Sequence, residues 1–204
     1  MNLLLDKLPE HLSIGGIPHK IRSDFRTWIK IENLLFWDGA PWGQRIANIL
    51  YQCYTEGIPT PIDEGIRAAM GFYSCIGSEK IEATSPSDVK EREKKEQKPT
   101  GWKNRVYSFN HDAGLIYAAF RAQYGINLQT SEMHWWEFNA LFSGLTEGNK
   151  ICKIMEFRAA DLSSFKDKET KTYYRKMKRV YRLPDPRSEE EQETDMMDVL
   201  ATAF

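Results

Sequence analysis

The chain has 204 residues, of which 41% are apolar and 12% aromatic, so it can form one domain with a substantial core. Its formal net charge of −1 gives no overall attraction to nucleic acid or membranes. The scattered Cys53, Cys75 and Cys152 argue against a disulfide framework or zinc site and fit a reducing cytoplasm. Asp6 and Lys7 interrupt the leading apolar run too early for a signal peptide, and no apolar run is long enough to span a membrane. We therefore expect a soluble intracellular protein.

The N-terminal part, residues 8–76, begins with a predicted β-hairpin. Leu12 and Ile14 alternate with polar residues and precede Gly15-Gly16, a pair suited to a tight turn. Pro18 requires the second strand to lie at an edge.

Three helices follow. The first is predicted over residues 24–37 with Ser23 as its N-cap, and Glu32 breaks its apolar stripe. The second covers residues 40–54 with Pro41 in its first turn, and the third covers residues 62–76.

Residues 77–101 alternate charges and contain few large apolar side chains, which predicts a flexible linker. The core part, residues 102–183, opens with a possible short strand, NRVYSF, at 104–109. A helix is then predicted from Asn110 to Tyr124, with Gly125 as the left-handed residue after it.

The next predicted helix is capped by Thr130 or Ser131 and ends at Gly144. Further helices are predicted over residues 149–158 and 164–182. Residues 184–204 carry seven acidic side chains against Arg187 alone, which predicts a disordered acidic tail. The prediction is a mainly α, bundle-like single domain over residues 1–183, with a small N-terminal hairpin and this tail.

Two adjacent tryptophans in the sequence MHWWEF (133–138) cannot both face one side of a helix. Trp135 falls on the main apolar stripe around Phe138, whereas Trp136 falls almost opposite, with Met133 and Ala140. The second strip is interpreted either as the face of a helix sandwiched inside the fold or as a recognition surface for a partner. We favour the sandwiched helix and keep Met133, Trp136 and Ala140 as candidate partner-binding residues.

No arrangement of residues predicts an enzyme, a cofactor or a bound metal. Asp112 is expected in the first turn of a helix, where a carboxylate complements the helix dipole, and His134 lies on the core stripe. The spacings typical of zinc proteases, phosphate-binding loops and serine hydrolases are absent.

The last helix carries eight Lys or Arg between residues 166 and 182, interleaved with tyrosines. Its basic face is open to three interpretations: an ordinary solvated face, a dock for the acidic tail or an acidic partner, or, less favoured, a nucleic-acid surface. The tail tip is apolar enough to form a short helix on a partner. Its candidate contact residues are Met196, Met197, Val199, Leu200 and Phe204.

Several motifs resemble a bacteriophage family known as gene-product fifteen. They are Asp24 to Trp28, Asp112 with Leu115 to Phe120, Gln123 to Ile126 with Leu128, His134 to Phe138 with Ala140-Leu141 and Gly144-Leu145, and Ile154-Met155 with Arg158. The resemblance covers roughly residues 8 to 183 and is densest over 112–158. The family is encoded in tail gene clusters of long-tailed phages and prophages and implies no catalytic residue.

Within these clusters the gene of this family lies between the genes for the tail tube and tape measure proteins. The resemblance therefore implies a non-catalytic tail assembly chaperone. Such a protein keeps the tape measure protein soluble until the tail tube polymerises, and it can also contact tail tube protein and other copies of itself. It acts in the host cell cytoplasm and is absent from the mature virion. The alternatives are a structural tail or connector protein retained in the virion and, further off, a basic-helix nucleic-acid-binding protein.

Overall fold

The computed structural model describes residues 2–36, 41–75 and 105–185. The predicted linker and the tail from residue 186 onward lie outside this part. Along the described chain the elements are β1 (His11–Ile14), β2 (Ile17–Lys20), α1 (Phe25–Phe36), α2 (Trp42–Cys53), α3 (Ile62–Tyr73), α6 (Ala113–Tyr124), α7 (Trp135–Ser143), α8 (Lys150–Ala159) and α9 (Lys168–Val180). The mainly α architecture with an N-terminal hairpin is confirmed.

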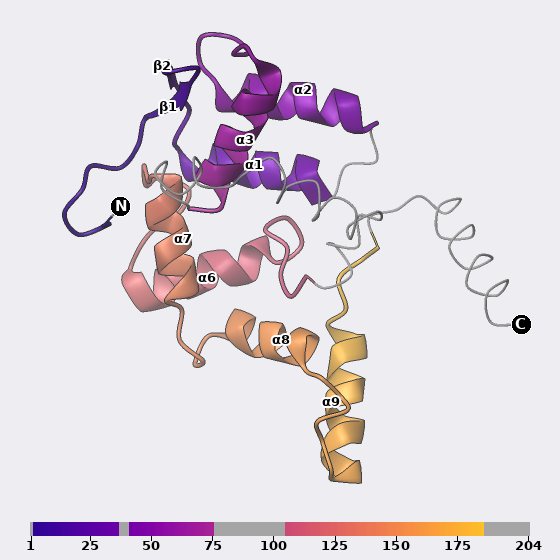
Figure 1. Cartoon of the computed structure of the whole chain (residues 1–204). Coiled ribbons are helices and arrows are strands. Elements are labelled where there is room, and N and C mark those ends of the chain that lie inside the picture. Colours follow the sequence, from indigo (N-terminus) through magenta and orange to yellow (C-terminus); the bar gives the residue numbers. More distant parts are fainter. Residues whose placement is uncertain (1, 37–40, 76–104, 186–204) are drawn as a thin grey trace, which may run out of the picture.

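The helices form two groups that are joined by α1 and α7. In Figure 1 the hairpin and α1–α3 occupy the upper part, and α6 and α7 lie below them. Helix α8 packs on α6, α9 packs on α8, and α9 extends downward from the rest. The chain therefore places α9 at the end of a series of contacts rather than at the centre of the core.

The hairpin turn follows from its two glycines. Gly15 and Gly16 have φ values of 57° and 78°, the left-handed conformation that a two-residue hairpin turn needs. Ile14 pairs with Ile17 across this turn in an antiparallel register. Leu12 and Ile14 are buried on one face, as the alternation predicted.

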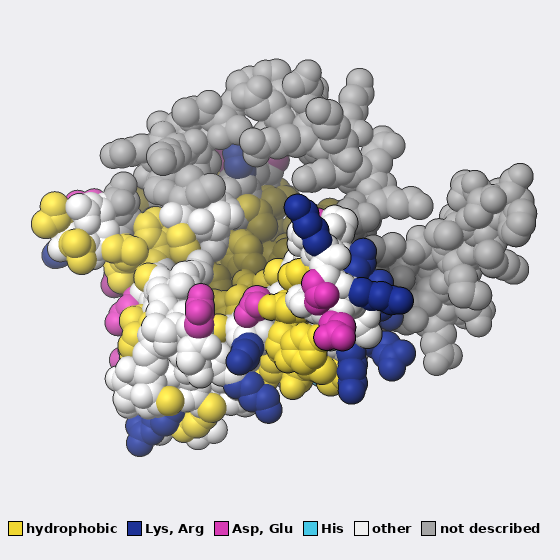
Figure 2. All heavy atoms as spheres, turned by 90° about the horizontal axis from the view of Figure 1, so that it is seen from below, with side chains coloured by type: hydrophobic (Ala, Val, Ile, Leu, Met, Phe, Trp, Pro, Cys, Tyr) yellow, Lys and Arg dark blue, Asp and Glu magenta, His cyan; other side chains and the backbone are white. Residues whose placement is uncertain are grey.

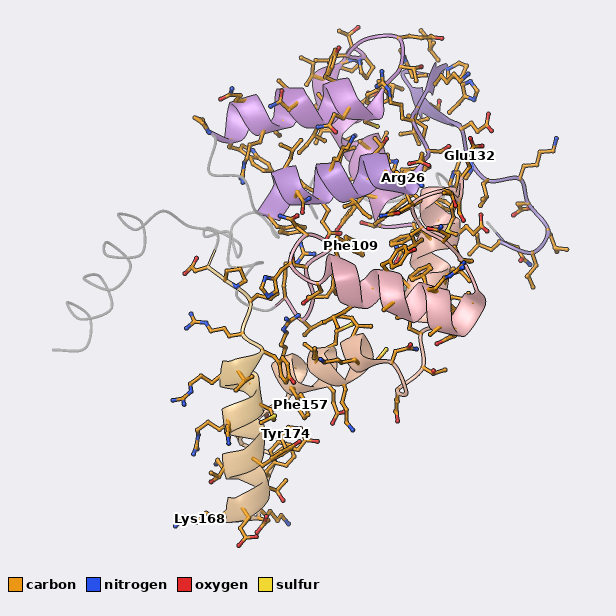
Figure 3. All side chains as sticks on the ribbon, turned by 180° about the vertical axis from the view of Figure 1, so that it is seen from behind. Arg26, Phe109, Glu132, Phe157, Lys168 and Tyr174 are labelled. Atoms are coloured by element: carbon orange, nitrogen blue, oxygen red, sulfur yellow. The ribbon has the colours of Figure 1, made fainter. Side chains whose placement is uncertain are left out.

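An aromatic core joins the two helix groups. Phe138 of α7 stacks on Phe25 of α1 at 4.7 Å between ring centroids and on Phe120 of α6 at 5.1 Å. Phe109, labelled in Figure 3, makes edge contacts with Trp135, Phe138 and Phe142. These rings bury large apolar areas, so they stabilise the contact between the two groups.

The predicted strand is wrong over the described residues 105–109, which are not paired with any strand. Ser108 and Phe109 are buried by packing instead, so an apolar pattern that suggested a strand reflects contact with the core. Gly125 does adopt the predicted left-handed conformation, with φ 70°.

Several predicted helix starts are displaced, and α6, predicted from Asn110, begins at Ala113. Asp24 rather than Ser23 accepts from the Arg26 amide at α1, and Asp167 caps α9, several residues after the predicted start. Helix α7 begins at Trp135 with His134 as its N-cap, and the amides of Thr130 and Ser131 instead donate to the Asn127 carbonyl in a preceding turn. At α7 the serine and threonine capping signals belong to the turn before the helix.

Candidate functional site: the α8–α9 surface

The adjacent Trp135 and Trp136 are both buried against the C-terminal end of α3. The Trp135 indole N–H donates to the Tyr73 carbonyl at 2.8 Å, and that of Trp136 donates to the Phe72 carbonyl at the same distance. Carbonyls at a helix end lack partners within the helix, so the two rings supply them. Trp136 is 5% exposed.

The predicted recognition strip is therefore divided between the interior and the surface. Met133 is buried with Trp136, whereas Ala140 is exposed. This burial favours the sandwiched-helix interpretation of the second apolar strip. The predicted contacts in the tail tip (Met196, Met197, Val199, Leu200 and Phe204) lie outside the described residues.

His134 has a structural role at the start of α7. Its Nδ1 accepts from the Trp136 amide at 3.1 Å, and its Nε2 lies 3.0 Å from the Pro9 carbonyl, to which it donates. The ring is therefore neutral, with its proton on Nε2. Burial lowers the pKa of His134, and the Pro9 contact only partly offsets this.

An open pocket of about 1060 Å³ surrounds this junction. Its lining includes Glu10 before β1, Asp24 and Arg26 at α1, and Glu132 and Glu137 near α7. Arg26 is held in place by Asp24 and by the carbonyls of Leu128 and Ser131 (2.7 and 2.9 Å). These contacts fix the loop before α7 against the start of α1.

Glu32, which interrupts the α1 stripe, forms a second buried polar cluster. Its carboxylate pairs with Arg105 and accepts from the Tyr73 hydroxyl at 2.7 Å. Burial raises the pKa of Glu32 even though the Arg105 charge opposes the shift. Glu32 is not among the residues that line the open pocket. The cluster therefore fastens the segment around Arg105 to α1 and α3.

A buried arginine anchors the α8–α9 surface to the core. Arg158 of α8 makes a bidentate pair with Asp112, with distances of 2.6 and 3.0 Å. Its Nη1 also donates to the Val106 carbonyl at 3.0 Å, and its Nε donates to the Tyr181 carbonyl at 2.5 Å. One side chain thus links the start of α6 to the end of α9. The sequence had placed Asp112 in a dipole role and did not reveal this pair.

Aromatic contacts connect α9 with α8. The Phe157 ring lies 5.6 Å from Tyr174 and 6.0 Å from each of Tyr173 and Tyr181. Figure 3 shows Phe157 and Tyr174 directed toward each other between the two helices. Phe165 stacks on Tyr174 from the connecting loop at 4.5 Å. Helix α9 is thus held by one side.

No residue of α9 is buried, so much of its apolar side remains accessible. Tyr173 is 51% exposed and Val180 is 59% exposed. At 100° per residue these two residues and the half-buried Met177 lie along one side of the helix. We call Tyr173, Met177 and Val180 the α9 edge. Figure 2 shows hydrophobic surface beside gathered lysine and arginine side chains in a view from this end of the molecule.

Among residues 2–36, 41–75 and 105–185, no group of three or more His, Cys, Asp or Glu could hold a metal ion. In the same residues, no helix is long and apolar enough to cross a membrane.

Comparison with known proteins identifies a family. A family model described as Bacteriophage Gp15 protein matches residues 4–183, which is most of the chain. No curated protein and no solved structure matches. The matched range contains every described helix, including α8, α9 and the Arg158–Asp112 pair.

Proposed function

The chain belongs to the bacteriophage Gp15 protein family, and on that premise we propose that it is a tail assembly chaperone. Family membership indicates a phage structural or morphogenesis protein. The proposed activity is non-catalytic: the chain binds the tape measure protein in the host cytoplasm, keeps it soluble until the tail tube polymerises, and is absent from the mature virion. Tail tube protein and other copies of the chain are further proposed contacts.

The observation that supports this activity is the α9 edge. A long tape measure helix exposes apolar stripes before the tube encloses it, and such stripes pack against apolar surface on another helix. Tyr173 and Val180 provide this surface on α9 with more than half of each side chain exposed, although the Tyr173 ring also borders Phe157 of α8 at 6.0 Å. The exposed edge is short, which suits a contact that must later release.

The location of the contact differs from the strip predicted on α7. Trp136 would have to leave its contact with the Phe72 carbonyl to reach a partner. Tyr173 and Val180 need no such rearrangement because they already face solvent. We therefore assign the tape measure contact to the α9 edge and retain Trp136 as a packing residue.

Co-expression with the neighbouring tape measure protein tests the proposal. We expect the soluble fraction of tape measure protein to rise when the chain is present and to fall again with the pair Tyr173→Ser and Val180→Ser. The matched control is Tyr51→Ser with Ile62→Ser, because these residues are 70% and 52% exposed in the other half of the molecule. An equally soluble tape measure protein without the chain refutes the chaperone activity, and equal effects of both variant pairs refute the assignment to α9.

The basic side of α9 supports one other candidate, a nucleic-acid-binding protein. Binding to random duplex DNA that weakens steeply with salt would favour it, because each neutralised phosphate releases counterions. Salt-independent or undetectable binding refutes this candidate and favours a protein partner for the basic side of α9.

A further inference from the structure

A basic stripe runs along the whole of α9. Lys168, Lys171, Arg175, Lys178 and Arg179 fall within an arc of about 100° at the helical repeat, and Arg182 follows two residues after the helix ends. Lys168, Arg175, Arg179 and Arg182 are exposed, and Lys178 reaches the Ala160 carbonyl at 2.8 Å. We call these six residues the α9 basic stripe. It lies on a different side of the helix from the α9 edge.

Like charges three and four residues apart repel each other on a helix, so the stripe favours a nearby anionic segment. Asp161, in the loop before α9, supplies one negative charge. Hydrogen bonds from Ser163 lower the pKa of Asp161, and the charges of Lys178 and Lys171 lower it further. Asp167, which caps α9, and Asp185 add two more carboxylates close to the stripe in the sequence, but six positive charges still outnumber the three carboxylates.

The chain beyond residue 185 has the matching charge and length. Residues 186–204 carry six carboxylates against Arg187. The stripe is about 21 Å long at 1.5 Å per residue, so about seven extended residues cover it. Residues 189–195 are such a run, with five carboxylates, and residues 186–188 are available for the reversal after α9.

We propose that the acidic segment 186–204 docks along the α9 basic stripe in the free protein and limits the access of other polyanions to it. Attachment directly after α9 keeps the segment at high effective concentration near the stripe, so individually weak ion pairs suffice. The proposal rests on charge and chain length and not on the proposed function, and its tests use the chain without any phage partner.

Zero-length carbodiimide cross-linking tests the contact itself in the full-length protein. We expect cross-links between carboxylates of residues 189–195 and the amines of Lys168 or Lys171. These cross-links should persist on dilution, because they are intramolecular, and should disappear at high salt, where charges are screened. Tail cross-links that are spread evenly over lysines such as Lys7, Lys20 and Lys30 overturn the proposal.

A fluorescent deca-glutamate peptide tests whether the segment limits access. In the full chain, Glu189→Gln, Glu190→Gln, Glu191→Gln and Glu193→Gln should tighten peptide binding by roughly tenfold at low salt. Adding Arg175→Gln and Arg179→Gln should remove that gain.

The matched control changes the net charge by the same amount at exposed sites far from α9 in sequence. It carries Glu10→Gln, Glu56→Gln, Glu132→Gln and Glu147→Gln. Peptide binding by the control should remain close to that of the wild type. The docked arrangement is refuted if the variant with four glutamine substitutions between residues 189 and 193 binds the peptide as tightly as the wild type or as this control.

Discussion

Replacing Trp136 by phenylalanine tests whether this residue is part of the core. The substitution keeps an aromatic ring beside Phe72, which lies 5.5 Å away, but removes the indole N–H that the Phe72 carbonyl accepts. Loss of the hydrogen bond costs about 1 kcal/mol. The smaller ring leaves roughly 40 Å³ unfilled, which adds about 1 kcal/mol at ~24 cal/mol per Å³. We therefore expect a loss of about 2 kcal/mol in the free energy of unfolding.

Urea unfolding followed by far-ultraviolet circular dichroism measures this loss. The control is Trp42→Phe, because Trp42 is 55% exposed and its substitution should change stability by less than about 0.5 kcal/mol. If Trp136→Phe is as stable as the control and instead reduces binding to the tape measure protein, the assignment of Trp136 to packing is refuted.

Three further predictions concern polar and backbone features. Arg158→Met should lower the free energy of unfolding by about 3–5 kcal/mol because it leaves the buried Asp112 carboxylate without its charged partner. Adding Asp112→Asn should recover part of this loss in urea unfolding. Additive effects of the two substitutions would contradict the pairing. Because the pKa of His134 is lowered in the folded state, its stabilisation is complete above about pH 6.5 and is lost as pH falls below that value. The urea midpoint should therefore drop less between pH 7.5 and 5.5 in His134→Asn than in the wild type, and parallel drops contradict the neutral tautomer. Gly125→Ala, at φ 70°, should lower the free energy of unfolding by about 1 kcal/mol, while Gly114→Ala in α6 should raise it by several tenths; equal effects in thermal unfolding would contradict the turn geometry.

Local sequence signals predicted the features that depend on neighbouring residues. The Gly15-Gly16 pair specified the hairpin turn, and Gly125 specified the end of α6. Hydrophobic periodicity located the described helices because it reflects burial of one face of each helix. The same signal exposed Glu32 as an interruption, but it could not show that Arg105 and Tyr73 approach it from distant parts of the chain.

Pairings between distant segments were not available from these patterns. The acceptor for Trp136 lies 64 residues earlier, and Asp112 and Arg158 are 46 residues apart. A periodic stripe shows that a side chain is buried without identifying what covers it. The second apolar strip of α7 was therefore open to two interpretations. The α9 edge could not be predicted either, because its exposure depends on how little of α9 is covered by α8.

Co-purification from cells that express both proteins tests the proposed chaperone activity most directly. Tagged tape measure protein is captured from the soluble fraction, and the amount of this chain bound to it is measured by quantitative mass spectrometry. We predict that several copies of the chain accompany each tape measure protein and that Tyr173→Ser with Val180→Ser removes most of them. The proposal is contradicted if soluble tape measure protein is recovered and the amount of this chain bound to it does not exceed background.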